Sequence, residues 1–192
     1  MKIMNVIGSP RSGGNSATVA RMLLEKLPAE NVRVRTVQLN QLNYRGCQGC
    51  MACKTQADQC AVRDDLTGVL EEIRASDLVL IATPVYIGEI SAQTKGLLDR
   101  FYSYFLPDYI TNPTPGRLAP GKKLVFIVSQ GNPDPNAYGD IIAKYTQFFG
   151  RLGFSNVYII RVLGAGPKSD VRIQETVLQS INDTARQIVA GA

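Results

Sequence analysis

Leu78-Val79-Leu80-Ile81-Ala82 is the uninterrupted apolar run that decides the fold class of this chain. Its length suits a strand, and a strand that is apolar on both faces must be covered on both faces. A second run of the same kind, Leu124-Val125-Phe126-Ile127-Val128, follows later. Because such strands belong to parallel sheets that lie between layers of helices, the two runs predict an α/β protein.

Segments of strand length alternate with amphipathic segments of helix length along the chain. The predicted strands are 2–8, 32–39, 78–83, 124–129 and 156–161. The predicted helices are 16–27, 65–75, 91–104, 138–152 and 168–190. The alternation predicts one doubly wound domain over residues 1–192, with a five-stranded parallel sheet in the order 2-1-3-4-5. Ligands of such sheets bind beyond the carboxyl ends of the strands, beside strand 1.

Composition excludes several classes of function. No apolar segment approaches the roughly 20 residues of a membrane span, and Ser9-Pro10-Arg11 ends the N-terminal apolar run too early for a signal peptide. We therefore expect a cytoplasmic protein without a membrane partner. The absence of histidine excludes mechanisms that need an imidazole base or ligand. The net charge of +5 comes from 21 basic residues spread evenly along the chain, so we expect no nucleic-acid partner.

The loop after the first predicted strand is suited to hold an anion. Gly8-Ser9-Pro10-Arg11-Ser12-Gly13-Gly14-Asn15-Ser16 leads into a helix, whose N-terminus presents free backbone N–H groups; Asn15 and Ser16 are both good N-cap residues. Arg11 suits a dianionic phosphate. Asn15 occupies the position at which the Walker A loop of nucleoside-triphosphate-binding proteins has a lysine. The Gly-x-Gly-x-x-Gly motif of dinucleotide-binding proteins is also absent after this strand. A terminal monophosphate such as that of FMN fits best, and a simple turn of small residues is the alternative.

Two further loops are expected at the same edge of the sheet. Thr83-Pro84-Val85-Tyr86-Ile87-Gly88 follows the third strand, and Tyr86 can lie against a flat ring. Ser129-Gln130-Gly131 ends the fourth strand and supplies polar groups there. An ordinary half-buried tyrosine and plain turn chemistry are the alternatives. The residues predicted to bind FMN are Ser9, Arg11, Gly14, Asn15, Ser16, Ala17, Pro84, Val85, Tyr86, Ile87, Gly88, Ser129, Gln130 and Gly131.

All the cysteines, Cys47, Cys50, Cys53 and Cys60, fall in an insertion after the second strand, which we call the cysteine segment (residues 40–64). In a cytoplasmic protein this clustering favours metal or redox use over structural disulfides. The four thiolates are predicted to hold one [4Fe–4S] cluster. A tetrahedral zinc site and free or redox-active thiols are the alternatives.

Three motifs carry a resemblance: Gly8-Ser9-Pro10-Arg11-x-x-Gly14-Asn15-Ser16, Thr83-Pro84-Val85-Tyr86-x-Gly88 and Ser91-Ala92-Gln93-x-Lys95-x-x-x-Asp99-Arg100. Over its first hundred or so residues the chain resembles the NADPH-dependent FMN reductase family, which belongs to the flavodoxin-like superfamily. The resemblance implies a phosphate in the first loop and an isoalloxazine ring against the second. The cysteine segment is similar to that of the iron–sulfur flavoproteins, which hold a cluster near FMN. Several relatives have an aromatic residue where this chain has Ile87.

These patterns predict an FMN-dependent oxidoreductase that transfers electrons between NAD(P)H, or a reduced carrier, and a small-molecule or protein acceptor. No side chain need act as a nucleophile. One alternative is a flavin-binding electron carrier or redox sensor without a substrate of its own. Another is an interaction domain that is stabilised by a bound metal. The resemblance implies a homodimer or homotetramer. The apolar stretch 101–106 suits a subunit contact, and helix packing within the chain explains it equally well.

Overall fold

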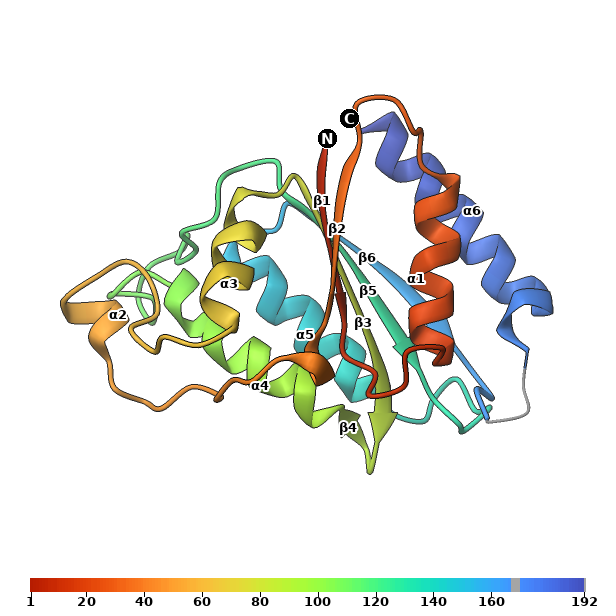
Figure 1. The fold of residues 1–192 in the computed structure, drawn as a ribbon, viewed down its shortest axis with the longest axis horizontal. Helices are drawn as coiled ribbons and strands as arrows, with labels where there is room; N and C mark the ends of the chain where they lie inside the picture. Colours follow the sequence, from red (N-terminus) through yellow and green to blue (C-terminus); the bar gives the residue numbers. More distant parts are fainter. Residues whose placement is uncertain (167–169, 192) are drawn as a thin grey trace.

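A computed structural model describes residues 1–166 and 170–191 and shows a twisted sheet between two layers of helices (Figure 1). The strands are β1 (Lys2–Ile7), β2 (Arg33–Gln38), β3 (Leu78–Tyr86), β4 (Glu89–Ile90), β5 (Lys123–Ser129) and β6 (Asn156–Val162). The parallel strands lie in the order β2-β1-β3-β5-β6, and β4 pairs antiparallel with the end of β3. The predicted α/β class is confirmed, but the predicted five-stranded sheet omitted β4.

The helices divide between the two faces of the sheet. Helices α1 (Asn15–Lys26) and α6 (Glu175–Ala190) cover one face, as Figure 1 shows on the right. Helices α3 (Leu66–Ala75), α4 (Ala92–Arg100) and α5 (Gly139–Leu152) cover the other. No helix within residues 1–166 and 170–191 is both long enough and apolar enough to cross a bilayer.

Each face of the sheet has its own hydrophobic core. In β3, Val79 and Ile81 belong to the core under α3, α4 and α5, whereas Leu78, Leu80 and Ala82 belong to the core under α1 and α6. All five side chains are completely buried. Because successive side chains of a strand point to opposite faces, a strand between two cores has no polar side, which explains the apolar run in the sequence.

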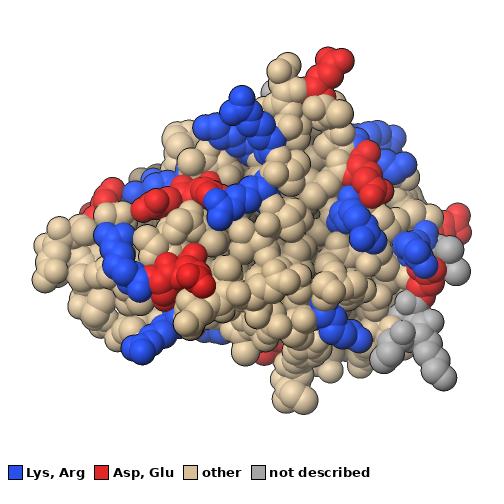
Figure 2. All heavy atoms as spheres, viewed as in Figure 1, with Lys and Arg blue, Asp and Glu red and all other residues tan. Residues whose placement is uncertain are grey.

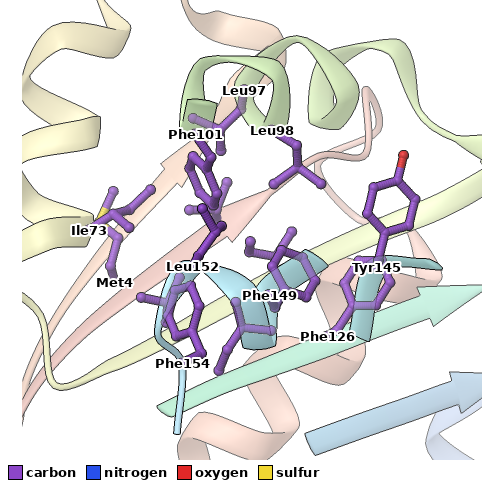
Figure 3. Packing of buried hydrophobic residues seen from close by; sticks show 14 of the residues in the cluster. Met4, Ile73, Leu97, Leu98, Phe101, Phe126, Tyr145, Phe149, Leu152 and Phe154 are labelled. Carbon is purple, nitrogen blue, oxygen red and sulfur yellow. The ribbon is translucent and has the colours of Figure 1, made fainter. Parts of the chain in front are cut away.

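Aromatic rings fill the core on the α4 and α5 side. Figure 3 shows Phe126 of β5 against Phe149 of α5, with ring centroids 5.3 Å apart, and Phe154 beside Phe149. Phe101 and Tyr104 are also buried, at 0% and 1% exposure. The apolar stretch 101–106 therefore packs mainly inside the chain, which favours the helix-packing explanation over a subunit contact.

The adjacent lysines Lys122 and Lys123 each cap the end of a helix. The buried Lys122 ammonium donates to the carbonyls of Ile73 (3.1 Å) and Ser76, at the end of α3. Lys123 donates to carbonyls at the end of α6, including that of Ile188 (3.2 Å). Cations in these positions satisfy carbonyls that have no helical partner. Elsewhere, on the face in Figure 2, basic side chains are interspersed with acidic ones.

The largest differences from the predicted boundaries occur where packing changes the local geometry. Strand β3 continues past Thr83 to Tyr86, because its end pairs with β4 and β5. The predicted helix 91–104 is divided in two: α4 ends at Arg100, and Phe101–Tyr104 form a 3₁₀ helix, η2. A one-turn helix, α2 (Ala52–Thr55), was not predicted. The predicted start of the last helix, residue 168, lies outside the described residues, and α6 follows a 3₁₀ turn, η3 (Val171–Ile173).

Candidate functional site

The loops after β1, β3 and β5 meet at the edge where the parallel strands end, at the bottom of Figure 1. The Gly8 N–H donates to the Ala82 carbonyl (2.8 Å), which joins the first loop to β3. Pro84 lies beside Ser129 in the register of β3 and β5. The fold therefore brings together the three segments that the sequence predicted as walls of one pocket.

The first loop forms an open cradle of about 500 Å³, lined by Pro10, Arg11, Ser12, Gly13, Gly14, Asn15 and Gly166. Ser9 is buried beneath it, and its Oγ accepts the Arg11 N–H (3.2 Å). The Arg11 side chain is exposed. A Cβ atom on Gly14 would lie 2.6 Å from Ser9 Oγ and 3.2 Å from the Arg11 carbonyl oxygen, so a larger residue requires the Ser9 hydroxyl to turn away and the backbone at Arg11 to give slightly.

The N-terminus of α1 faces this cradle without a polar cap of its own. Its N-cap residue is Gly14, not Asn15 or Ser16, and neither a capping side chain nor an acidic residue serves the first turn. Asn15 Nδ2 instead donates to the Gly166 carbonyl (3.3 Å), and Ala17 is partly buried in the helix. Ser16 is buried, and its hydroxyl has no hydrogen-bond partner among the described residues. Such unsatisfied donors at a helix N-terminus are the groups that bind an anion.

The second wall becomes more exposed towards its tip. Pro84 is buried and Val85 partly buried, whereas Tyr86 is 43% and Ile87 104% exposed. Ile87 and Gly88 have φ angles of 48° and 74°, as a tight turn between β3 and β4 requires. Glycine adopts this conformation freely, but a β-branched side chain does so only with strain, and strained residues concentrate at functional sites. No pattern in the sequence signals a left-handed isoleucine.

Replacing Ile87 by asparagine is expected to raise the free energy of unfolding by about 1 kcal/mol, because asparagine tolerates a positive φ and the exposed side chain loses no packing. Urea denaturation measures the change. Ile110→Asn is the matched control, since Ile110 is also exposed (78%) and has no positive φ. Equal changes for the two variants would contradict the strain at Ile87.

A buried cluster of hydroxyl groups joins the first two loops to α4. Ser91 Oγ donates to the Gly8 carbonyl (2.7 Å) and lies 2.9 Å from Thr94 Oγ1, and the Ser91 N–H donates to Thr83 Oγ1 (3.2 Å). All three hydroxyl residues are completely buried. Ser91 also caps α4. The cluster holds the loops in place before any ligand binds, and the predicted site did not include it.

The third wall offers less side-chain chemistry than the sequence implied. Ser129 and Gln130 are buried, and Gly131 is exposed. Gln130 Nε2 donates to the carbonyls of Asn132 (3.0 Å) and Asp134 (3.1 Å), while its Oε1 accepts from Arg161 (2.8 Å). The Gln130 amide therefore braces its own loop.

The cysteine segment leaves the lower end of β2, runs past α4 and reaches α2 at the left of Figure 1, away from the cradle. Cys47 and Cys50 are exposed, and the Gly49 N–H donates to Cys47 Sγ (3.5 Å). Cys53 is buried, and Cys60 lines a separate small cavity between α3 and η2. Within the described ranges, no three cysteine, aspartate or glutamate side chains are arranged to hold a metal ion. The predicted ligands are thus close in sequence but not gathered in space.

One buried arginine holds both ends of the cysteine segment. The Arg100 guanidinium donates to the Arg45 carbonyl (3.0 Å), which precedes the cysteines, and to the Val62 carbonyl (2.8 Å), which follows them. It also pairs with Asp64 (2.9 Å), and its side chain has no exposed surface. Asp64 in turn accepts the Arg45 N–H (3.0 Å). Arg100 belongs to one of the sequence motifs, but the motif predicts no role for it.

Two further cations hold the middle of the segment against η2. Lys54 Nζ donates to the carbonyls of Tyr102 (2.6 Å) and Phe105 (2.7 Å) and lies 4.1 Å from the centre of the Tyr102 ring. Arg117 donates to the carbonyls of Cys53 (3.0 Å) and Ser103 (3.1 Å). The cysteine segment is thus attached to the C-terminal end of α4 and to η2.

The Asp64 carboxylate makes the fold sensitive to acid. Burial alone raises the pKa of Asp64, but hydrogen bonds from Arg45, Arg100 and Leu66 outweigh it and hold the pKa below the usual 3.8. A carboxyl group with a lowered pKa stabilises the folded protein above the unfolded pKa. This contribution is complete at neutral pH and is lost as the pH falls below about 3.8 and through the folded value.

We therefore expect Asp64→Asn to lower the free energy of unfolding at pH 7 by at least about 2 kcal/mol, because several charge-assisted hydrogen bonds are lost. The difference from the wild type should shrink as the pH falls through the acid range. Urea denaturation at a series of pH values measures it. Asp183→Asn, at an exposed pair with Arg186, is the control and should change little. A difference that does not depend on pH would contradict the assignment.

The chain matches a family of known proteins. A family model of the flavodoxin-like fold matches residues 1–184. The chain belongs to the flavodoxin-like fold family. The match covers the cradle, the hairpin at the end of β3 and the cysteine segment, and it confirms the resemblance stated from the sequence motifs.

Several known proteins align with part of the chain. An iron–sulfur flavoprotein of Methanocaldococcus jannaschii is 31% identical over 121 residues, which are 63% of this chain and 62% of that protein. One from Methanosarcina thermophila is 37% identical over 100 residues, or 52% of each. An FMN-dependent NADH:quinone oxidoreductase of Escherichia coli O6:K15:H31 is 28% identical over 130 residues, 66% of this chain and 63% of that protein. The chain thus matches about half to two thirds of the length of these relatives.

Solved structures of flavodoxin-like proteins match along nearly the whole chain. An NAD(P)H:quinone oxidoreductase from Methanothermobacter marburgensis has a TM-score of 0.73 at 19% identity and covers 98% of this chain and 97% of its own. An FMN-dependent NADH-azoreductase from Bacillus anthracis, solved in complex with FMN, has a TM-score of 0.70 at 18% identity, covering 97% of this chain and 98% of its own. At these identities the likeness establishes the fold.

Proposed function

We propose that this flavodoxin-like protein is an FMN-dependent oxidoreductase that takes electrons from NAD(P)H or a reduced carrier and passes them to an acceptor. The observation that carries the proposal is the cradle at the N-terminus of α1, together with the Ser16 hydroxyl in the first turn of that helix, which has no hydrogen-bond partner among the described residues. A helix N-terminus with free donors and a nearby arginine suits a phosphate monoester. The names of the relatives, FMN-dependent NADH:quinone oxidoreductase and iron–sulfur flavoprotein, support the same function.

In this proposal the chain's own residues bind and orient the cofactor. Ser9, Arg11 and residues 14–17 hold the phosphate. Residues 84–88 form the wall for the ring, and residues 129–131 close the third side. FMN bound there supplies hydride and single-electron transfer. The protein contributes hydrogen-bond donors and a rigid frame, which the buried Ser91 cluster provides.

A [4Fe–4S] cluster on Cys47, Cys50, Cys53 and Cys60 is a second cofactor that we propose. The four thiolates are the donor set of such a cluster, and the Gly49 N–H donates to Cys47 Sγ in the way that backbone donors surround cluster sulfurs. The iron–sulfur flavoproteins among the relatives support it. Because no three of these thiols are gathered to hold a metal ion within the described residues, the cysteine segment must rearrange for a cluster to bind. A homo-oligomer is proposed on the family resemblance.

The absorption spectrum of anaerobically purified protein, with assays for iron, sulfide and zinc, tests both cofactors. A flavin spectrum is expected, with a broad shoulder that bleaches on reduction if the cluster is bound. Oxidation of NADH and NADPH with quinone and ferric acceptors then tests turnover. Protein that neither contains nor binds FMN would disprove the proposal. FMN without turnover would favour an electron carrier, and sedimentation gives the oligomeric state.

A further inference from the structure

The hairpin of β3 and β4 projects from the edge of the sheet at which FMN is proposed to bind. At the bottom of Figure 1 it extends past the ends of the other strands. Two residue pairs, Val85–Ile90 and Tyr86–Glu89, form it, and the buried Ile90 anchors its base. Ile87, at the tip, is fully exposed. Because a hairpin this short has marginal stability by itself, contacts outside it must fix the position of its tip.

The Glu89 carboxylate joins this hairpin to α5. Its Oε2 pairs with Lys144 Nζ (2.5 Å), and its Oε1 accepts the Ile90 N–H (2.8 Å). Lys144 Nζ also lies 4.9 Å from the centre of the Tyr145 ring. The carboxylate interacts with the Tyr145 hydroxyl as well, which points out of the aromatic core in Figure 3. The carboxylate thus contacts both the hairpin backbone and α5, which fixes the distance between them.

The charges of this contact favour a local role. Burial alone raises the pKa of Glu89, but interactions with Lys144, the Ile90 N–H and Tyr145 outweigh it and hold the pKa below the usual 4.5. The carboxylate is therefore ionised at neutral pH. The side chains of Glu89 and Lys144 are 36% and 50% exposed, and pairs with this exposure contribute little to the stability of a whole fold. Such a pair is suited to fixing the position of one hairpin.

Tyr138, directly before α5, approaches the same hairpin without holding it. A Cβ atom on Gly88 would lie 3.8 Å from Tyr138 Cε1, which is ordinary van der Waals contact. Because Gly88 has no side chain, this contact limits how closely the tip approaches α5 but cannot keep it there. Tyr138 and Ile87 both have positive φ angles, 61° and 48°, so the facing segments are both strained. The attractive contact between them is that of Glu89.

We propose that Glu89 is a positioning residue for the flavin. Through Lys144 and Tyr145 it holds the hairpin, and with it residues 86–88, where the isoalloxazine ring binds. Glu89 acts through Tyr86, its partner across the hairpin, and does not itself touch the ring. The inference rests on the proposed function, because residues 86–88 are a wall of the site only if FMN binds at this edge of the sheet.

Fluorescence titration of the wild type and Glu89→Lys with FMN and with riboflavin tests the proposal. The substitution brings two ammonium groups together, so both flavins should bind about fivefold more weakly, the upper range for a surface ion pair. An equal loss for the two flavins distinguishes a displaced ring wall from a lost phosphate contact. The fluorescence of bound riboflavin should also increase, because Tyr86 moves away from the ring.

The charge swap provides the rescue. Glu89→Lys combined with Lys144→Glu restores the pair and should return both affinities to within about twofold of the wild type, since one ion pair is replaced by another. The midpoint of urea denaturation should stay the same in the single and double variants. Asp183→Lys, at the exposed pair with Arg186 on α6, is the matched charge reversal and should leave both affinities unchanged.

The possible failures are distinguishable. A wild type that binds neither flavin would overturn the proposed function and this inference with it. If the wild type binds both, unchanged affinities in Glu89→Lys would overturn this inference alone. A loss that the charge swap does not restore, or one that accompanies a lower midpoint of urea denaturation, would show that Glu89 does not act by positioning the hairpin.

Discussion

Arg100→Met is expected to lower the free energy of unfolding by about 3–5 kcal/mol, the largest effect on stability that we expect of a single substitution in this protein. The side chain is completely buried, and its removal leaves the Asp64 carboxylate without its charged partner and takes the guanidinium donor from the Arg45 and Val62 carbonyls. A buried charge without its partner is far more costly than a lost surface pair. Urea denaturation at pH 7 measures the change.

The Arg100 variant should also loosen the cysteine segment selectively. Hydrogen exchange is expected to increase between residues 45 and 64, and the buried Cys53 thiol should react faster with a disulfide reagent. The double variant with Asp64→Asn should lose less stability than the sum of the two single variants, because both residues act in one network. Arg186→Met, at an exposed pair on α6, serves as the control. Unchanged exchange between residues 45 and 64 would show that Arg100 does not hold the segment.

Arg11→Ala is expected to weaken FMN binding by about ten- to a hundredfold, the range for loss of a hydrogen bond between charged groups. The exposed Arg11 side chain lines the cradle where the phosphate is proposed to bind. Quenching of flavin fluorescence gives the dissociation constant. Riboflavin, which has no phosphate, should bind equally to the wild type and the variant, so the ligand pair isolates the phosphate contact.

Gly14→Ala provides an independent test of the same cradle. The added methyl group would lie 2.6 Å from Ser9 Oγ and displace this hydroxyl, which is proposed to hold the phosphate, so FMN affinity should fall here too. Arg21→Ala, on the exposed surface of α1, is the control for general charge effects. Normal FMN affinity in the Arg11 and Gly14 variants would assign the phosphate to another place.

The sequence by itself determined the parallel α/β architecture and the cradle. Both depend on residues that are neighbours in the chain. The apolar runs at 78–82 and 124–128 specify strands buried on both faces, and residues 8–16 form one strand-to-helix loop. Such local features form in the same way whatever the neighbouring elements are, so the sequence alone predicts the loops at the end of the sheet.

Only the tertiary structure decided how the cysteine segment is held. The Arg100 guanidinium joins residues 45, 62 and 64 from the end of α4, far away in the sequence. The left-handed conformation of Ile87 is likewise imposed by the pairing of β3 with β4. Such contacts depend on the relative placement of whole elements, which no pattern of neighbouring residues encodes.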